Sequence, residues 1–445
     1  MSFNVALSGL AAANKDLAVT GNNIANVATT GFKGSRAEFA DVYSASILGT
    51  GGKVAGAGVR TAAISQQFTQ GNINHTGNSL DLAINGNGFF AMSAQGQMMY
   101  TRAGEFGTDK DGYIQNSSGF RLQGFPVGAG GQILQGKKVD LQVDTSSVSP
   151  KATSLINETI NLDSTASIIP AAPGFDSSDP ETFNWSTSVP VYDSLGNSHT
   201  MTHYFSRRQE VLPATGTYWE MYTLIDGLDP LDPTSNVPTP ERLEFDTYGR
   251  LTMPAAGEFT IPMGDPTATP PVVGWVPQQI TDATTNPPTA VANGAVANPT
   301  GVTVSFADMT QFNAVSAVTS QKQDGYATGQ LSGLNIDENG NMFAAFTNGE
   351  SKLIGQVMLV NFSNPQGLKP VGGTAWVETY ASGVPIEGMA KSGTFGAIQA
   401  GALEESNVDL TAQLVQLIKA QSNYQANAKT VTTQTTVMQT TINMT

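Results

Sequence analysis

The chain of 445 residues contains no cysteine, which excludes disulfide bonds, thiol nucleophiles and cysteine-ligated metal centres. It has only three histidines, so imidazole-based acid–base or metal chemistry has few candidate positions. Charged residues make up only 13% of the chain, and the net charge of −15 comes without any basic run, which argues against binding of nucleic acid. No stretch of about 18 apolar residues occurs, and residues 1–10 lack the regions of a signal peptide, so we expect neither membrane insertion nor Sec export.

The sequence also lacks the short motifs that carry common chemistry. There is no Walker loop, dinucleotide fingerprint or nucleophile elbow, and the glycine-rich segment 49–58 is typical of a flexible loop. His199 and His203 alternate with other residues as on a strand, so a pair on a surface strand is favoured over a metal site. The acidic turn 335–340 has Phe346 where a calcium loop needs glutamate, which favours a hairpin. We therefore expect no catalytic residues, no metal site and no bound cofactor.

Glycine and proline are abundant, at 47 and 23 residues, and this predicts many turns and a mainly β protein. Nineteen of the prolines and three of the four tryptophans lie between residues 150 and 299. Because proline prevents long helices and limits strands, we predict that 146–325 is an inserted outer β-rich domain of short strands and long loops. Its tryptophans suit either a carbohydrate site or a core, and the core is favoured for Trp185, Trp219 and Trp275.

Local patterns outside and inside this segment support strands and tight turns. Leu80–Asn85 alternates apolar and polar residues, which predicts a half-buried strand. Four Asp-x-x-Gly tetrads lie between strand-like runs, where aspartate accepts a backbone N–H and glycine takes the positive φ of a closing turn. They predict hairpins at 109–112, 193–196, 246–249 and 337–340.

The length alone favours about three domains. The flanks 76–145 and 326–402 share the alternating style, so we expect them to close one discontinuous β domain around the insert. Residues 31–75 are expected to connect that domain to a helical domain formed by 1–30 and 403–445.

Both ends of the chain carry apolar residues at heptad spacing, the pattern of a helix that buries a narrow stripe. The N-terminal stripe has the rows Phe3, Leu10, Leu17, Ile24 and Ala6, Ala13, Thr20, Val27. The C-terminal stripe has the row Leu403, Leu410, Leu417, Tyr424, Val431, Met438, with Leu414, Ala428 and Ile442 at partner positions. Ser406 and Asp409 match a capping box before it. We predict two terminal helices that pair, parallel or antiparallel, as a coiled coil.

These predicted helices are nearly uncharged. Between residues 410 and 445 only Lys419 and Lys429 carry charge, and threonine is frequent. A solvated helix normally carries glutamate and lysine on its outer face, and threonine-rich segments form helices poorly. One interpretation is a disordered tail; the other is a helix that forms only when it packs on copies of itself or lines a water-filled lumen.

Two classes of function fit these observations. The first is a self-assembling structural protein whose ends are the assembly elements. The second is a secreted β-rich enzyme, adhesin or carbohydrate-active protein whose proline-rich middle carries a ligand groove. Clustered carboxylates or aromatic side chains around a cleft would favour the second class.

Two motifs at opposite ends of the chain are specific. The segment 22–33, Asn-Asn-Ile-Ala-Asn-Val-Ala-Thr-Thr-Gly-Phe-Lys, resembles the N-terminal signature of the bacterial flagellar rod and hook protein family. The segments 405–410 and 420–429 are similar to its C-terminal signature. Segments 2–10 and 82–90, together with the large insert, are most similar to the hook members, because rod members are typically shorter. The middle of the chain is compatible by position only.

The resemblance implies an extracellular tubular homopolymer that joins the rod of the flagellum to its filament, bends as a universal joint and transmits torque. It implies as partners further copies of the chain, other axial proteins at the rod and filament junctions, and the flagellar type III export apparatus. A rod or other axial protein of the same family is the alternative. The terminal helices would form the inner tube, with this expected assembly interface: Phe3, Leu10, Leu17, Asn22, Asn23, Ile24, Asn26, Leu410, Leu414, Leu417, Tyr424, Val431 and Met438.

We predict that both termini, including residues 410–445, are disordered in the free monomer and helical in the polymer, because their polar faces and threonine content cannot support an isolated helix. Hydrogen exchange on a monomer confirmed by sedimentation measures this, and fast exchange is expected across the whole segment. Strong protection of these amides in the monomer would contradict the prediction.

Overall fold

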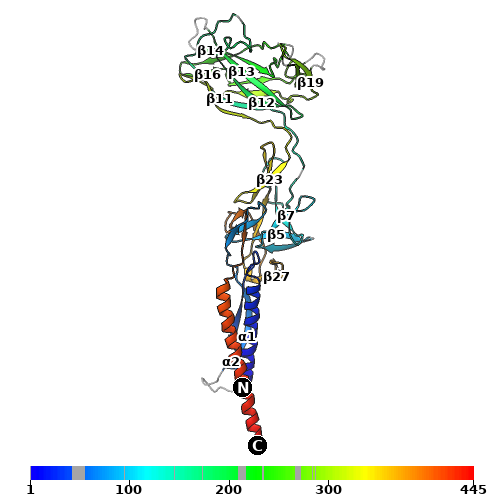
Figure 1. Ribbon diagram of the computed structural model, residues 1–445, viewed down its shortest axis with the longest axis vertical. Helices are drawn as coiled ribbons and strands as arrows, with labels where there is room; N and C mark the ends of the chain where they lie inside the picture. Colours follow the sequence, from blue (N-terminus) through cyan, green and yellow to red (C-terminus); the bar gives the residue numbers. More distant parts are fainter. Residues whose placement is uncertain are drawn as a thin grey trace. The chain divides into compact units, whose positions relative to one another are not determined.

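The protein is described by a computed structural model that covers residues 2–42, 56–94, 96–144, 146–172, 174–208, 217–232, 235–265, 272–282, 284–285 and 287–444. Most of the glycine-rich loop predicted at 49–58 lies outside the described residues. The chain is mainly β with a helix near each end (Figure 1), which confirms the predicted fold class.

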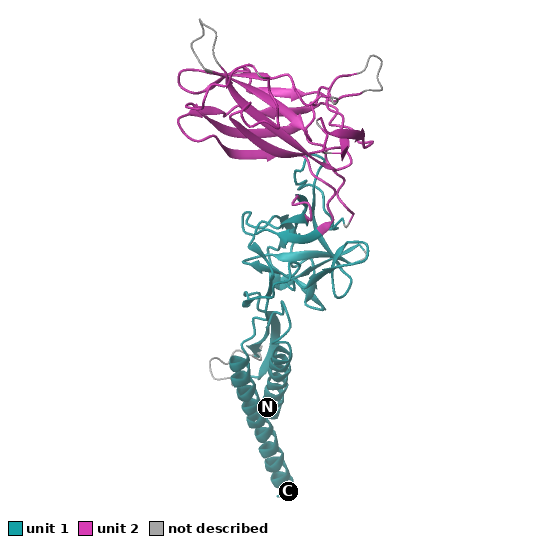
Figure 2. Cartoon of the chain, turned by 45° about the horizontal axis from the view of Figure 1, so that its top comes forward, with its two compact units in different colours: residues 1–145, 332–345, 351–445 teal, residues 146–331, 346–350 magenta. Residues whose placement is uncertain are grey.

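The chain forms two compact units (Figure 2). Unit 1 comprises residues 1–145, 332–345 and 351–445, and unit 2 comprises residues 146–331 and 346–350. The finer division into helical, connecting, inner β and outer β parts stays a prediction.

The two terminal helices belong to unit 1 and are α1 (Ser2–Ala25) and α2 (Leu410–Asn443). None of the helices in the described ranges is long and apolar enough to cross a membrane. The small two-stranded sheets of the unit pair β1 (Ser35–Asp41) with β2 (Val59–Gln66), β3 (Ile73–His75) with β31 (Ala402–Glu404), and β4 (Leu82–Asn85) with β30 (Ala397–Ala400).

Unit 1 also contains most of a 13-stranded sheet, whose main path among the described residues runs β23-β24-β25-β9-β5-β6-β28-β27. Phe89, Tyr100, Phe125 and Trp376 form much of the core against it. The strands are β5 (Phe89–Ala94), β6 (Gln97–Thr101), β7 (Phe106–Thr108), β8 (Ile114–Asn116), β9 (Arg121–Pro126), β10 (Val139–Asp140), β23 (Leu331–Ile336), β24 (Asn341–Phe346), β25 (Ser351–Val357), β26 (Leu359–Asn361), β27 (Lys369–Gly372), β28 (Ala375–Val377) and β29 (Ile386–Gly388). A 3-10 turn spans Pro365–Gly367.

The start of α2 differs from the predicted capping box. Asp409 is the N-cap, because its carboxylate accepts the backbone N–H groups of Thr411 and Ala412 at 2.8 and 3.2 Å. The placement of Ser406 at the cap is therefore wrong, and the helix begins three residues later. Alanine stands at the third helical position, where a capping box needs glutamate or glutamine, so aspartate alone satisfies the first free N–H groups.

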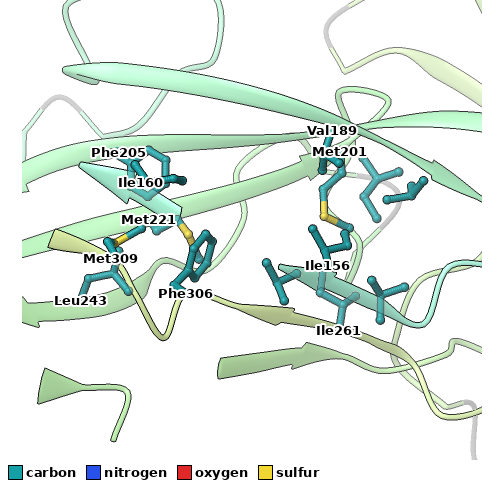
Figure 3. Packing of buried hydrophobic residues seen from close by; sticks show 14 of the residues in the cluster. Ile156, Ile160, Val189, Met201, Phe205, Met221, Leu243, Ile261, Phe306 and Met309 are labelled. Atoms are coloured by element: carbon teal, nitrogen blue, oxygen red, sulfur yellow. The ribbon is translucent and has the colours of Figure 1, made fainter. Parts of the chain in front are cut away.

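Unit 2 contains two five-stranded sheets whose inner faces share one core (Figure 3). One sheet has the order β17-β20-β11-β21 with β22 paired to β11, and the other has the order β12-β13-β14-β15-β16. The strands of unit 2 are β11 (Leu155–Asp163), β12 (Trp185–Tyr192), β13 (Ser198–Arg208), β14 (Thr217–Ile225), β15 (Glu241–Phe245), β16 (Leu251–Met253), β17 (Glu258–Ile261), β18 (Gln278–Asp282), β19 (Thr289–Ala292), β20 (Val302–Ser305), β21 (Thr310–Phe312) and β22 (Ala317–Gln323).

The tryptophans of unit 2 are core residues, as predicted. Trp219 and Trp275 are buried in the cluster between the sheets, and Trp185 packs against it. They therefore offer no exposed aromatic platform of the kind that binds sugars.

Two expectations about unit 2 are wrong. The longest strand, β13, has 11 residues rather than being short, because no proline falls between Pro190 and Pro213. His199 and His203 lie on one face of β13 as predicted, but both are buried rather than on the surface. Their face points to the core side of the sheet. The predicted alternation is therefore confirmed, but the predicted position on the surface is wrong.

The strand predicted at residues 80–85 is β4, but it is not half-buried. Leu82, Ala83 and Ile84 are all fully buried. Both faces of this short strand are covered within unit 1. The alternation of polar and apolar residues therefore did not predict how much of the strand is exposed to solvent.

All four predicted hairpin turns are confirmed. In each tetrad the glycine N–H donates to the carbonyl of the aspartate at 2.9 to 3.1 Å, and each glycine has a φ between 75° and 85°. At 337–340 the Asp337 carboxylate also accepts the N–H groups of Asn339 and Asn341 at 2.9 Å. This segment is a closed turn whose aspartate is engaged by the backbone.

We predict that unit 1 folds without unit 2. The chain segments that enter and leave unit 2 run side by side, with bridges between Val148 and Gly329 and between Lys151 and Tyr326, so a short Gly-Ser linker can replace residues 149–328. The expected result is a far-ultraviolet circular dichroism spectrum and a protease-resistant fragment that match unit 1. General proteolysis of the shortened chain would show that unit 1 needs unit 2 to fold.

Candidate assembly site at the junction of the two chain ends

The helices α1 and α2 pack side by side in antiparallel orientation (Figures 1 and 2). Near one end of the pair the Asn23 amide donates to the Gln413 side-chain oxygen at 3.1 Å. Further along, a Cβ built on Gly9 would lie 2.4 Å from the Asn427 side-chain oxygen. Residue numbers thus fall along α1 while they rise along α2, which decides between the two predicted orientations.

The residues of the two predicted rows of α1 are buried or half-buried. Ala6, Ala13 and Thr20 are buried, and their small side chains allow close approach of the second helix. The larger residues beside them are half-buried: Phe3, Leu10, Leu17 and Ile24.

The row through which α2 meets α1 agrees with the predicted one only in part. Its least exposed members are Gln413, Leu417, Ala420, Asn427, Ala428, Val431 and Gln434, of which Leu417, Ala428 and Val431 were predicted. Leu414 and Ile442, predicted as seam partners, are 45% and 68% exposed, so their assignment to the seam within one chain is wrong. Polar and small residues stand beside Leu417 and Val431 in this row, because α1 offers small side chains and the buried amide of Asn23, which needs a polar partner. Three further predicted interface residues of α2 are exposed: Leu410, Tyr424 and Met438.

Asn23 holds three elements together. It is only 3% exposed, its amide donates to the Ser35 carbonyl at 2.7 Å and to Gln413, and its oxygen accepts the Ser35 N–H at 2.8 Å. The other signature asparagines end the helix, because the Asn26 amide donates to the Asn22 carbonyl at 2.9 Å. The N-terminal signature is therefore a helix stop joined to the first residue of β1.

The carboxylate of Glu404 is the centre of the junction. It accepts the Lys33 ammonium at 2.6 Å, the Arg102 guanidinium at 3.1 Å and the N–H of Gly71 at 3.0 Å. The side chains of Lys33 and Glu404 are fully buried and that of Arg102 is 5% exposed. Lys33 also donates to the Thr69 carbonyl at 2.8 Å. Segments from residues 33, 71, 102 and 404 thus meet at one carboxylate.

These charges depend on one another. Burial lowers the pKa of Lys33 below its usual value, and the negative charge of Glu404 opposes that change. Burial likewise acts against the charge on Arg102, which guanidinium groups nevertheless retain. An unpaired buried charge is far more costly than a paired one, so the cluster is stable only when all three side chains are in place.

The backbone around the cluster is held by a second set of polar contacts. The Asn407 side chain accepts the Gly34 N–H at 2.8 Å and donates to the Gln67 carbonyl at 2.6 Å. Gly31 has a φ of 66°, and a Cβ there would lie 2.4 Å from the backbone nitrogen of Ala103. Only glycine fits this position, which explains its place in the N-terminal signature.

The heptad analysis did not find the charged residues of this junction. Lys33 and Asn407 fall inside the two signature segments, but Arg102 and Glu404 were not recognised. The available signal was the scarcity of charge, since Lys33 follows 16 residues without any charged side chain. A lone charge at the edge of an uncharged segment has either solvent or a buried counter-ion as partner, and the sequence does not distinguish the two.

A groove of about 580 Å³ opens beside the N-terminal signature. Asn22, Asn26 and Phe32 line it, together with Pro370 and Trp376. Two of the predicted interface residues, Asn22 and Asn26, therefore border an accessible hollow of unit 1 rather than the seam between the helices.

Four family models match successive parts of the chain. They are the flagella basal body rod protein model at residues 3–33, the flagellar hook protein FlgE/F/G D1 domain at 83–166, the flagellar basal body protein FlaE D2 domain at 161–326, and the flagellar basal body rod FlgEFG protein C-terminal model at 399–444.

Whole proteins and a solved structure match as well. The flagellar hook protein FlgE of Escherichia coli K12 is 36% identical over 448 residues, with all of both chains covered. The FlgE of Treponema pallidum is 32% identical, with 98% of each chain covered. The crystal structure of the Helicobacter pylori flagellar hook protein FlgE2 is similar in fold, with a TM-score of 0.50 and 15% identity over 74% of this chain and all of that one.

The matched family models, together with paired and nearly uncharged helices from both chain ends, define the class as an axial structural protein of the flagellum. The chain belongs to the flagellar hook protein family. It is a structural subunit of the hook, part of the external flagellum.

We predict that Glu404→Gln destabilises unit 1 by about 3–5 kcal/mol, because it leaves two buried cations without their counter-charge. The control is Glu387→Gln, which removes the exposed pair with Lys138 and is expected to cost less than about 1 kcal/mol. Urea unfolding of the 5-fluorotryptophan-labelled chain, followed by ¹⁹F NMR, separates the units, since Trp376 is the one tryptophan of unit 1. Equal midpoints of the Trp376 signal in both variants would contradict the prediction.

Proposed function

We propose that this subunit assembles with copies of itself into a flexible tube through the outward side of α2. The observation that carries the proposal is a row of apolar side chains that α1 does not cover. Leu410, Leu414, Val415 and Ile418 are between 44% and 63% exposed. Leu410, Leu414 and Ile418 follow one another at spacings of four, and Val415 lies three residues before Ile418, so the four form one stripe along the first turns of the helix.

This outer row has the properties of a contact surface. Large exposed apolar stripes on a soluble chain favour association, and no charged side chain interrupts the segment from 410 to 418. Gln413 on the inward side is bonded to Asn23 of α1, so we infer that α2 has one face for its own chain and one for a neighbour. Among the other predicted interface residues, those that stay accessible in one chain are proposed to complete the contact: Asn22 and Asn26 at the groove, and Tyr424 and Met438 on α2.

The mechanical part of the proposal assigns different roles to the two units. Apolar packing of the terminal helices would hold the inner tube, while the outer β surfaces would slide over one another. Support comes from the outward positions of β12 and β13, which present Ser186, Ser188, Thr200 and Thr202. Neutral hydroxyl groups form weak contacts that exchange readily with water, which suits a joint that bends while transmitting torque.

Membership of the family also supports partners beyond the chain itself. We infer contacts with other axial proteins at the rod and filament junctions, and export through the flagellar type III apparatus. Export is tested by expressing the chain inside a strain that lacks its own hook protein and measuring how much of the chain is secreted.

We predict that Leu414→Ser and Ile418→Ser prevent assembly without unfolding the subunit. Each removes an apolar contact of about 1.5–3 kcal/mol from every subunit interface, which raises the concentration needed for assembly roughly tenfold to a hundredfold. Polymer yield is measured by sedimentation and electron microscopy, and folding by circular dichroism. The control Lys419→Gln changes an exposed neighbour on the same helix and should leave the yield unchanged. Normal tubes from both serine variants would contradict the proposed face.

A further inference from the structure

The buried histidine His199 in unit 2 is held between two carboxylates. Its Nδ1 lies 2.6 Å from the Oδ2 of Asp226, and its Nε2 lies 3.3 Å from the Oδ2 of Asp193. The ring is 4% exposed and meets the Trp275 ring edge to face at 5.4 Å between centroids. No water-filled space is needed to complete its hydrogen bonds.

Both carboxylates are already committed as acceptors. Asp193 has a fully buried side chain that also accepts the N–H groups of Leu195 and Asn197 and the side-chain amide of Asn293. An ionised carboxylate cannot donate, so each ring nitrogen that faces one must carry the proton itself. A doubly protonated ring satisfies both contacts, so the geometry favours an imidazolium ion at His199.

The second carboxylate belongs to a tight turn. Asp226 has a φ of 53° and Gly227 a φ of 81°, and the N–H groups of Ile225 and Leu228 exchange hydrogen bonds across them, as in a two-residue hairpin turn. Positive φ is uncommon for a residue other than glycine. The contacts of Asp226 with His199 and with the Thr200 N–H at 2.8 Å offset this strain.

The neighbouring histidine provides a natural contrast. His203 lies four residues further along the same strand face and is fully buried, but its Nδ1 contacts only the hydroxyl of Thr223 and its Nε2 has no partner among the described residues. Phe259 and Phe306 pack edge to face against its ring. Burial lowers the pKa of His203 to about 3, so this side chain is neutral at pH 7.

We propose that the proton on His199 acts as a clamp that joins strand β13 to two turns of unit 2, the hairpin turn 193–197 and the turn at 226–227. Asn293 of a neighbouring loop is connected to this clamp through Asp193. Loss of this proton in alkaline solution removes one of the two carboxylate hydrogen bonds and loosens the clamp. The titratable groups that face the ring are Asp193 and Asp226; Asp229 is a further carboxyl group beside Asp226 and Trp275, with which it lines a small cavity. The inference goes beyond assembly and is tested on the monomer.

The direction of the pH dependence follows from the surroundings of the ring. Burial alone would lower the pKa of His199, but the hydrogen bonds and charges of Asp226 and Asp193 outweigh it and raise the pKa above its usual value. A cation with a raised pKa in the folded state stabilises the fold below the unfolded pKa, and this contribution is lost as pH rises through the folded value. The contribution of His203 to stability has the opposite pH dependence: its pKa is lowered in the folded state, so the fold is destabilised as the pH falls.

The chain contains only three histidines, so ¹⁵N-histidine labelling of the full chain gives three ring systems. At pH 7 we expect two protonated ring nitrogens for His199 and one for His203. Histidine-to-glutamine variants assign the signals. A His199 ring that is neutral at pH 7 would overturn the proposal.

Amide exchange in the same chain tests the clamp itself. As pH rises through the His199 midpoint, the protection factors of Asn197 and Thr200 are expected to fall by about tenfold or more, the effect of losing one charged hydrogen bond. In Asp226→Asn, which keeps a residue tolerant of positive φ, the midpoint of His199 should fall by at least about one pH unit. His203→Gln serves as the control and should leave both readouts of His199 in place. Unchanged protection across the titration, or an unchanged midpoint in Asp226→Asn, would show that the proton holds nothing together.

Discussion

The buried carboxylate of Glu404 is the interaction on which the arrangement of unit 1 depends. A carboxylate without solvent needs cations and N–H donors around it, and Glu404 receives them from Lys33, Arg102 and Gly71. Because these residues lie far apart in the sequence, the carboxylate is satisfied only when both chain ends and the β strands have come together. The cost of an incomplete cluster makes the junction cooperative.

The helix pair follows from this junction. Lys33 follows α1 and Glu404 precedes α2. Their contact therefore brings the end of α1 next to the start of α2, and the two helices pack antiparallel. Asn23 then places α1 against Gln413 of α2. This orientation covers one face of α2 and leaves the row at Leu414 and Ile418 open, which is the surface proposed to bind the next subunit. The ionic contact inside one chain thereby determines which apolar contacts remain for others.

Local patterns in the sequence predicted the features that depend on interactions between residues close together in the chain. The terminal helices, the four aspartate–glycine turns and the burial of tryptophan in unit 2 all follow from spacing and residue type. The Glu404 cluster could not be predicted in this way, because its members are separated by up to 371 positions and each charge alone matches a solvated side chain. The same limit explains the error at His199, whose alternation with Thr200 marks a strand face but does not say which face a second sheet covers. The seam of α2 was predicted only in part: Leu417 and Val431 are among its less exposed residues, but Leu414 is exposed, because apolar spacing alone does not say which side of the helix α1 covers.

The most direct test of the central claim is disulfide formation between engineered cysteines in this cysteine-free chain. Gly9→Cys with Asn427→Cys places the two thiols where a Cβ on residue 9 would lie 2.8 Å from the Cγ of Asn427, and Gly9→Cys with Gln425→Cys is the control. The account predicts rapid oxidation of the first pair within one subunit of the assembled tube, little of the control pair, and loss of this selectivity when Glu404→Gln is added. Equal crosslinking of both pairs, or selective crosslinking that persists without the Glu404 charge, would contradict the claim that the buried carboxylate sets the register of the helices.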